Sequence, residues 1–230
     1  RFYVPPGMVV APGGGLTRIG MLDPVVTNTA EGLRFESFSV CCGVYARLDV
    51  EASALDAAHC AVGVTNVDVN QPLRAALASL RAGEPLHLRV GEEGLTATTL
   101  DEEVTEEKVP LSLRWLKGFA ETQMLSSAMM PLHTLNAAQA RAFIRGLPKS
   151  SATGTVMWAG RDVRGLRLGS RPAPVAACVS GPERLRVFEP LLHVSTSLEA
   201  YGPDADAGSE PVASLWVARM PGARLSVGLS

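Results

Sequence analysis

Several features that mark secreted, membrane-spanning or strongly basic proteins are scarce in this sequence. Its four cysteines are unevenly spaced along 230 residues and form no disulfide framework, which favours a reducing, cytoplasmic location. No apolar run reaches the roughly 18 residues that a membrane-spanning helix needs, and prolines interrupt the apolar stretch 4–16. The formal net charge of −2 excludes a strongly basic nucleic-acid-binding protein but leaves a local basic patch open. Because the chain begins at Arg1, we expect that it is a fragment or that a preceding piece is missing.

Motifs for nucleotide binding and catalysis are missing as well. The glycine run 13–15 has neither the Gly-Lys-Ser/Thr ending of a P-loop nor the spacing of a dinucleotide-binding loop, so it predicts a surface loop. The sequence contains no G-x-S-x-G and no H-E-x-x-H motif. We therefore favour a function without catalysis. An enzyme of unknown reaction, with a pocket near Cys41 and Asp68, is kept as an alternative.

The stretch 33–50 carries the most unusual pattern, a cysteine pair between two alternating runs. Both faces of 33–42 carry apolar or small residues, as in a strand covered on both sides. Adjacent side chains of a strand point to opposite faces, so Cys41 and Cys42 are poor joint metal ligands, even with His59 and Cys60 added. We favour small buried thiols. In 44–50, apolar residues alternate with polar ones, which predicts a half-buried strand. Its exposed side chains are expected to be Tyr45, Arg47 and Asp49.

Further along, one order of elements recurs three times: a helix followed by three strands. The first helix is expected over 72–82, with a buried stripe that comprises Leu73, Leu77 and Leu80. Its three strands are expected at 86–90, 95–100 and 109–113, the last after an acidic turn at 101–107. A separate helix is predicted over 119–129. The second and third rounds begin at a helix capped by Asn136 and at a helix started by Pro182. Their strands are expected at 154–159, 164–169, 174–179, 197–202, 212–218 and 223–229.

These rounds predict an α+β fold of repeated helix-plus-three-strand units with mostly antiparallel sheets. The arrangement resembles the βαβββ unit of DNA sliding clamps, although a likeness of fold does not by itself imply the function. We expect an extended lead-in over 1–32, a first α+β unit over 33–130 and a second over 131–230.

Several ordered blocks also resemble a known family. They are the stretches 32–49, 62–77, 106–123, 141–148, 166–174 and 183–192. Together they are similar to the region that precedes the zinc finger in bacterial SWIM zinc-finger family proteins. The finger needs C-x-C followed by C-x-H as four zinc ligands, and this sequence contains neither. The resemblance therefore implies no metal site or cofactor in this chain, and zinc only if a finger lies outside it. It also implies a multi-protein system with MoxR-type AAA+ ATPases and von Willebrand A proteins as partners.

Two sets of polar residues are candidate sites. Asn66, Asp68 and Asn70 share one face of an expected strand and could hold a cation or a hydroxyl group, although turn and capping chemistry before Pro72 also explains them. The second set is basic and could bind nucleic acid or an acidic partner, although we favour a solvated surface for the arginines within 161–186. It comprises Arg114, Lys117, Arg161, Arg164, Arg167, Arg171, Arg184 and Arg186.

A non-enzymatic interaction or scaffold module of a multi-protein assembly is thus the leading prediction. The first alternative is a clamp-like protein that binds nucleic acid through the arginines within 161–186. The second alternative is the enzyme of unknown reaction. No membrane contact is expected.

Overall fold

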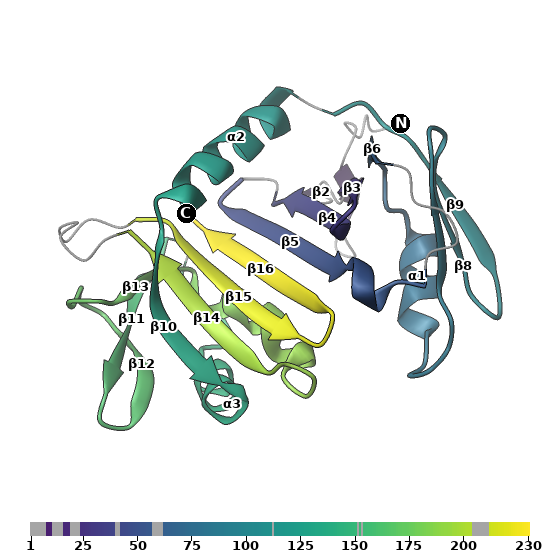
Figure 1. Ribbon diagram of the computed structural model, residues 1–230. Coiled ribbons are helices and arrows are strands. Elements are labelled where there is room, and N and C mark those ends of the chain that lie inside the picture. Colours follow the sequence, from purple (N-terminus) through teal and green to yellow (C-terminus); the bar gives the residue numbers. More distant parts are fainter. Residues whose placement is uncertain are drawn as a thin grey trace.

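The computed structural model describes most of the chain (Figure 1). The described residues are 8–10, 16–18, 24–39, 42–56, 62–111, 113–150, 152, 154–203 and 212–230. Two short strands near the start, β1 (Met8–Val10) and β2 (Leu16–Arg18), pair antiparallel with each other. The glycine run 13–15, Cys41, His59 and Cys60 lie outside the described residues.

An eight-stranded antiparallel sheet forms the centre of the fold, in the order β10-β14-β15-β16-β5-β4-β3-β6 (Figure 1). Strand β16 pairs with β5 from Ala223–Val50 to Leu229–Val44, so the last strand of the chain lies beside an early one. The sheet therefore contains strands from both expected units. Its strands are β3 (Val25–Thr29), β4 (Gly32–Phe38), β5 (Val44–Glu51), β6 (Gly63–Asn66), β10 (Met130–Asn136), β14 (Ser197–Gly202), β15 (Ser214–Met220) and β16 (Ala223–Leu229).

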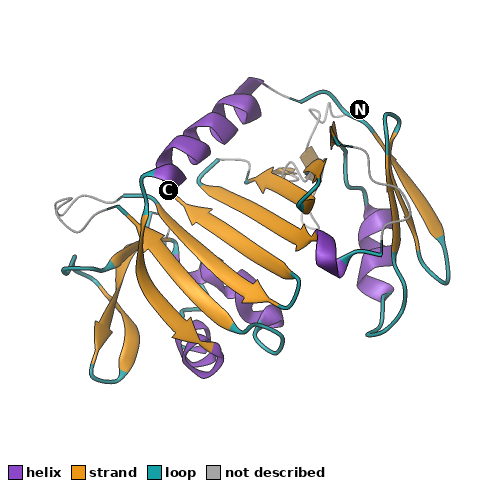
Figure 2. Cartoon of the chain, in the orientation of Figure 1, coloured by secondary structure: helices purple, strands orange, loops and turns teal. Residues whose placement is uncertain are grey.

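Two three-stranded antiparallel sheets and the helices complete the structure (Figure 2). One small sheet has the order β7-β8-β9 and the other the order β12-β11-β13. Their strands are β7 (His87–Val90), β8 (Gly94–Thr98), β9 (Glu103–Glu107), β11 (Val156–Asp162), β12 (Gly165–Gly169) and β13 (Ala177–Ser180). The helices are α1 (Gln71–Ser79), α2 (Leu113–Ser127), α3 (Ala137–Arg145) and the 3₁₀ helices η1 (Ala52–Ala54) and η2 (Pro182–Leu191).

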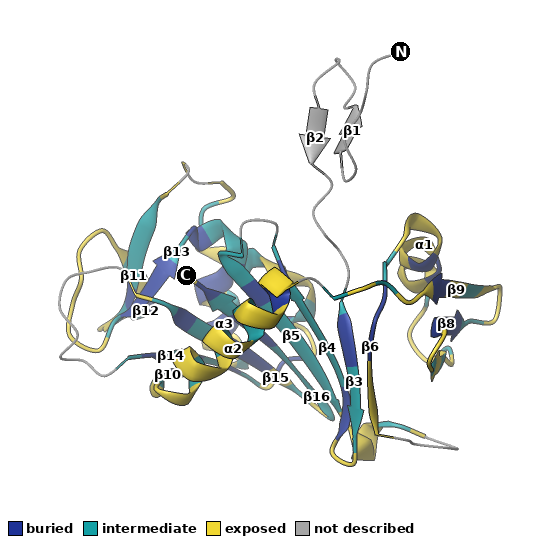
Figure 3. Ribbon diagram, turned by 90° about the horizontal axis from the view of Figure 1, so that it is seen from above, coloured by how far each residue is buried: buried dark blue, intermediate teal, exposed yellow. Residues whose placement is uncertain are grey.

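The two faces of the large sheet have different coverings. Alternate side chains of each strand form what we term the core face, which packs against α3 and η2 at one end and against α1 at the other. Phe143 and Trp216 stack there with ring centroids 5.4 Å apart. The opposite face, which we term the α2 face, carries Arg34, Tyr45 and Asp49. Helix α2 covers one end of it, and much of the helix surface is exposed (Figure 3).

The predicted fold class is confirmed. Each of the helices α1, α3 and η2 is followed by three strands, as the recurring order predicts. Strands β14 and β16 have the predicted bounds, and Asn136 caps α3 through a capping box with Gln139. One sheet contains strands from both expected units. The division into units at 32/33 and 130/131 stays a prediction.

Other predictions were wrong in their details. Residues 101–107 were expected to form a turn, yet β9 occupies Glu103–Glu107, because alternating residues of the strand meet solvent and tolerate acidic side chains. The described residues of 109–113 therefore form no strand, although one was expected. Helix α2 begins at Leu113 rather than at 119. The expected lead-in contains β3, which pairs with both β4 and β6.

The first helix also buries different residues from those expected. Leu73 and Ala76 are buried in α1, whereas Leu77 is 39% exposed and Leu80 ends the helix as its C-cap. Helix α1 is short and packs mainly against β9, so only the side that carries Leu73 and Ala76 is covered. The buried spacing is therefore three residues rather than four.

The turn before β13 holds a valine in a strained conformation. Val175 has a φ of 57°, in the left-handed region that β-branched residues rarely adopt.

The buried ring of His133 on β10 contacts β11, because its Nε2 lies 3.1 Å from the carbonyl oxygen of Ala159. Burial lowers the pKa of His133, and the charge of Arg161 adds to that effect. A neutral imidazole therefore links β10 to β11.

Replacement of the strained Val175 by glycine should stabilise the protein. Glycine adopts positive φ without steric cost, so Val175→Gly should raise the free energy of unfolding by about 1 kcal/mol after the loss of unfolded-state rigidity is counted. Val163→Gly is the matched control, because Val163 is a fully exposed turn valine without positive φ. Chemical denaturation measures both variants. Equal or lower stability of Val175→Gly relative to Val163→Gly would show that the backbone conformation of Val175 does not destabilise the fold.

Candidate functional site

Helix α2 is attached to the sheet by an aromatic cluster. Trp115 and Phe119 point from the first half of the helix onto Phe38 of β4, with ring centroids 5.7 and 5.0 Å from it. Tyr45 of β5 completes the cluster at 5.2 Å from Phe38. Gly118 lets the helix approach, because a Cβ atom there would lie 3.1 Å from the Phe38 ring. Trp115 is 3% exposed and lies within α2.

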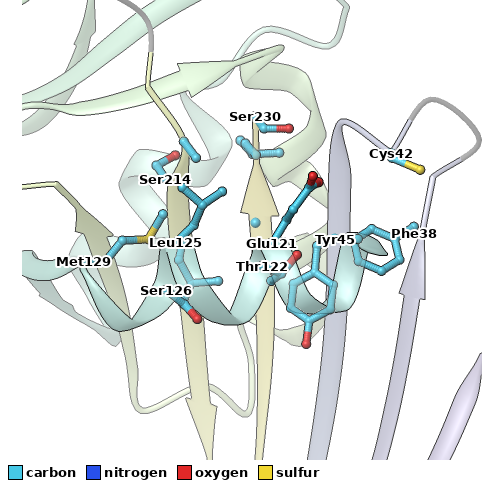
Figure 4. A pocket seen from close by; sticks show the side chains of 15 residues that line it. Phe38, Cys42, Tyr45, Glu121, Thr122, Leu125, Ser126, Met129, Ser214 and Ser230 are labelled. Carbon is cyan, nitrogen blue, oxygen red and sulfur yellow. The ribbon is translucent and has the colours of Figure 1, made fainter. Parts of the chain in front are cut away.

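Beyond this cluster the helix and the sheet enclose an apolar pocket (Figure 4). Leu125 lines it from the end of α2, Met129 from the link between α2 and β10, and Leu215 and Leu229 from β15 and β16. Its empty volume is about 560 Å³, and it opens to solvent. The remaining lining residues are Phe38, Cys42, Tyr45, Gly118, Glu121, Thr122, Ser126, Ala213, Ser214, Gly228 and Ser230. Glu121 is the one charged side chain among these described residues, so the pocket suits an apolar group and disfavours an anion.

The outward side of α2 is apolar too. Leu113, Leu116 and Met124 are 83%, 50% and 68% exposed, and Ala120 is exposed between them. The positions 113, 116, 120 and 124 follow helical spacing and form one stripe. A helix with aromatic residues beneath it and an unpaired apolar stripe outside is typical of a surface that contacts another protein.

An arginine cluster occupies the α2 face further along the same strands. The carboxylate of Asp49 on β5 accepts hydrogen bonds from Arg34 on β4 at 2.9 Å and from Arg224 on β16 at 3.0 Å. Arg47, two residues before Asp49, donates two more bonds at 2.8 Å. Burial alone would raise the pKa of Asp49, but the hydrogen bonds from Arg47, Arg34 and Arg224 lower it to about 2. We term Arg34, Arg47, Asp49 and Arg224 the arginine cluster.

Tyr45 stands between the pocket and the cluster. The sequence predicted that its side chain is exposed, yet Tyr45 is 8% exposed because α2 covers this end of the strand. Its hydroxyl donates to the carboxylate of Glu36. Burial, followed by this bond, raises the pKa of Tyr45. Tyr45 therefore stays a neutral donor near neutral pH.

The basic residues singled out in the sequence do not form one patch. Arg114 and Lys117 lie on α2, and Arg161, Arg164, Arg167 and Arg171 lie in or beside the hairpin of β11 and β12, whereas Arg184 and Arg186 lie on η2. The register places Arg161 and Arg167 on opposite faces of the hairpin. Three of the arginines also have protein partners: Arg161 donates to Thr134, Arg167 pairs with Asp162, and Arg186 pairs with Glu189. Nucleic-acid binding by these residues stays a prediction.

The polar trio has a structural partner that the sequence did not reveal. Asn70 is the N-cap residue of α1, and its backbone N–H and its Nδ2 both donate to Glu106 at 2.9 Å. Glu106 is 4% exposed, so it is a buried carboxylate at the positive end of the helix. Asn66 is buried and donates to Val109, and Asp68 is half-buried between the two. A role of the trio in binding stays a prediction.

The cysteine segment differs from the expected strand. Strand β4 ends at Phe38, and Cys42 has a φ of 58° in the turn before β5. Its thiol is half-exposed and lines the apolar pocket. The described residues contain no group of three or more His, Cys, Asp or Glu side chains that could hold a metal ion. The enzyme hypothesis stays open, but Asp68 does not line this pocket.

Comparisons with known proteins identify the fold. No protein-family profile and no curated protein sequence matches the chain. The structure is similar to a chain in the crystal structure of the PCNA2–PCNA3 complex from Sulfolobus tokodaii, with a TM-score of 0.59 and 10% identity over 90% of this chain and 89% of that chain. The likeness confirms a sliding-clamp-like α+β fold and, at this identity, shows the fold alone. Within the described part of the chain, no helix is long and apolar enough to cross a membrane.

Asp49 should make stability depend on pH in the acid range. Its pKa in the folded state lies below the ordinary value of 3.8, so its contribution is complete above about pH 4 and is lost as pH falls towards about 2. Asp49→Asn should therefore lower the free energy of unfolding by roughly 2 kcal/mol at pH 7 and flatten its decrease between these pH values. Asp101→Asn, in an exposed turn, is the control. Urea denaturation across this range measures both. Parallel pH profiles of wild type and Asp49→Asn would contradict the effect.

Proposed function

We propose that this chain is a non-enzymatic interaction module that binds a partner protein through the pocket and the stripe of α2. The observation that carries the proposal is the apolar surface on both sides of one helix. Leu125 and Met129 line the open pocket beneath the helix, and Leu113, Leu116 and Met124 remain exposed outside it. Contiguous exposed apolar surface of this kind favours protein contacts.

The chemistry of the pocket favours a protein segment over other ligands. Its described lining contains no lysine or arginine, so phosphate-bearing ligands such as nucleotides would lack a counter-charge. Apolar walls with hydroxyl groups from Thr122 and Ser126 fit the side chain of an apolar residue whose backbone meets the polar rim. A partner segment could place one such anchor in the pocket and rest neighbouring residues on the stripe.

Two likenesses support an assembly of several proteins. The structural neighbour was crystallised as a complex of two PCNA chains. The ordered sequence blocks resemble the region before the zinc finger in bacterial SWIM-family proteins, which implies MoxR-type AAA+ ATPases and von Willebrand A proteins as partners. We therefore take those two classes of protein as the first candidates. Membership in that family is part of the proposal.

A single helix substitution should separate the pocket from the rest of the surface. Leu125→Asp places a charge in the apolar lining, whereas Ala75→Asp places the same charge on the exposed side of α1, which packs on the opposite face of the sheet. Because Leu125 is 49% exposed, the substitution should leave the fold intact. Leu125→Asp should weaken partner binding roughly tenfold or more, and Ala75→Asp should have little effect.

The probes are a purified MoxR-type ATPase and a purified von Willebrand A protein from the same organism, with affinities measured by biolayer interferometry. Association of either protein with the wild type, weakened in Leu125→Asp, is the expected result. If neither protein associates, the proposed assembly with these two classes of protein is wrong. If both aspartate variants bind like the wild type, the pocket is not the contact.

A further inference from the structure

We propose that the arginine cluster is a carboxylate-binding site, which takes an acidic side chain of the same partner segment whose apolar anchor fills the pocket. The inference rests on the proposed function and adds the chemistry of the partner. It is carried by three observations: a surplus of hydrogen-bond donors, an open cavity over the cluster, and the distance along β5 between the cluster and the pocket.

The cluster has more donors than its own acceptor can use. Each oxygen of Asp49 already accepts two hydrogen bonds, so the carboxylate is saturated. Arg34 and Arg224 donate to this carboxylate only through their Nε–H groups. Within the described residues, the terminal NH₂ groups of these two arginines have no protein partner. One guanidinium suffices for one carboxylate, so three leave donors for a second acceptor.

These donors are reachable from solvent. The side chains of Arg34, Arg47 and Arg224 are 31%, 25% and 42% exposed, whereas Asp49 is 15% exposed beneath them. An open polar cavity with an empty volume of about 510 Å³ lies at the β3–β4 turn and the end of β5, and Arg34, Asp49 and Arg224 line it. Because Asp49 holds the Nε side of each guanidinium, the rotamers are fixed before a ligand arrives and little entropy is lost on binding.

The cluster and the pocket lie on one face and along one strand. Tyr45 lines the pocket and Asp49 lies four residues further on the same side of β5, about 13 Å away at 3.3 Å per residue. Arg47 lies between them. Helix α2 covers the end of this face near Tyr45 and Phe38 (Figure 1). An extended partner segment can therefore place an apolar anchor in the pocket and a carboxylate about four residues away at the cluster.

The surroundings favour a single carboxylate over a nucleic acid. Glu31 and Glu51, both exposed, line the same cavity as Arg34, Asp49 and Arg224. Their charges would repel the successive phosphates of a nucleic acid, which also needs a continuous basic path. A lone aspartate or glutamate side chain needs only the NH₂ donors that Arg34 and Arg224 leave unused. A bidentate bond from a guanidinium suits that group.

Selection from a peptide library tests the inference without a known partner. Random peptides of about 12 residues span ~40 Å when extended, enough to reach both sites. Peptides that bind the wild-type protein but do not bind the Leu125→Asp protein are the pocket binders. We expect them to carry an aspartate or glutamate about four positions from a large apolar residue. Arg34→Gln and Arg224→Gln should each weaken such a peptide roughly tenfold. Arg164→Gln, at an exposed turn of the β11–β12 hairpin, should not.

A double-mutant cycle gives the decisive measurement. Replacing the acidic residue of the selected peptide by glutamine should cost the wild type the same roughly tenfold affinity and should cost Arg224→Gln almost nothing, since the contact is already lost. Urea denaturation of each variant verifies that it is folded. Equal losses in both proteins would overturn the inference, because the acidic residue would then act elsewhere.

The remaining outcomes separate this inference from the proposed function. Pocket binders without an acidic preference overturn the inference and leave the proposed function standing. Selected peptides that bind wild type and Leu125→Asp alike overturn the proposed function. Displacement of the peptides by inorganic phosphate or by a single-stranded oligonucleotide, with affinity that falls steeply as salt rises, overturns the assignment to a protein carboxylate.

Discussion

The pairing of β16 with β5 is the constraint on which the rest of the structure depends. It joins residues near Asp49 to residues near Arg224 across a sequence separation of 175. This one ladder makes the sheet continuous, so α3 and η2 cover one end of its core face and α1 covers the other. It also forms both candidate surfaces. Without it, Gly228 and Leu229 would not meet Tyr45 in the pocket, and Arg224 would not meet Asp49.

Helix α2 uses the sheet differently from the other helices. Helices α1, α3 and η2 each begin a round of three strands, and all pack on the core face. Helix α2 lies outside this repetition and on the opposite face, attached by Trp115 and Phe119 in its first half. Its second half lines the open pocket. The element that departs from the repeated order thus carries the exposed apolar surface.

The sequence predicted parts of the fold well where a local pattern decides the structure. The alternation in 197–202 and 223–229 and the capping box at Asn136 are each complete within a few residues. The pattern failed where a distant element decides burial. Tyr45 reads as an exposed residue of an alternating strand, yet α2 covers it. The acidic run 101–107 reads as a turn, yet β9 forms because β8 pairs with it and solvent accepts its polar face.

The candidate site was the least predictable part. The basic residues noticed in the sequence are numerous in 161–186, but β11, β12 and η2 disperse them. The cluster that the structure assembles uses Arg34, Arg47 and Arg224 from three strands. Of these, the sequence singled out only Arg47, as an exposed residue of a strand. By itself, the sequence determined the helix and strand periodicities, the repeated order of elements and the α+β class, because these follow from local spacing. Only the tertiary structure decided which side chains share the α2 face, because strand register between distant segments is set by packing that no local pattern contains.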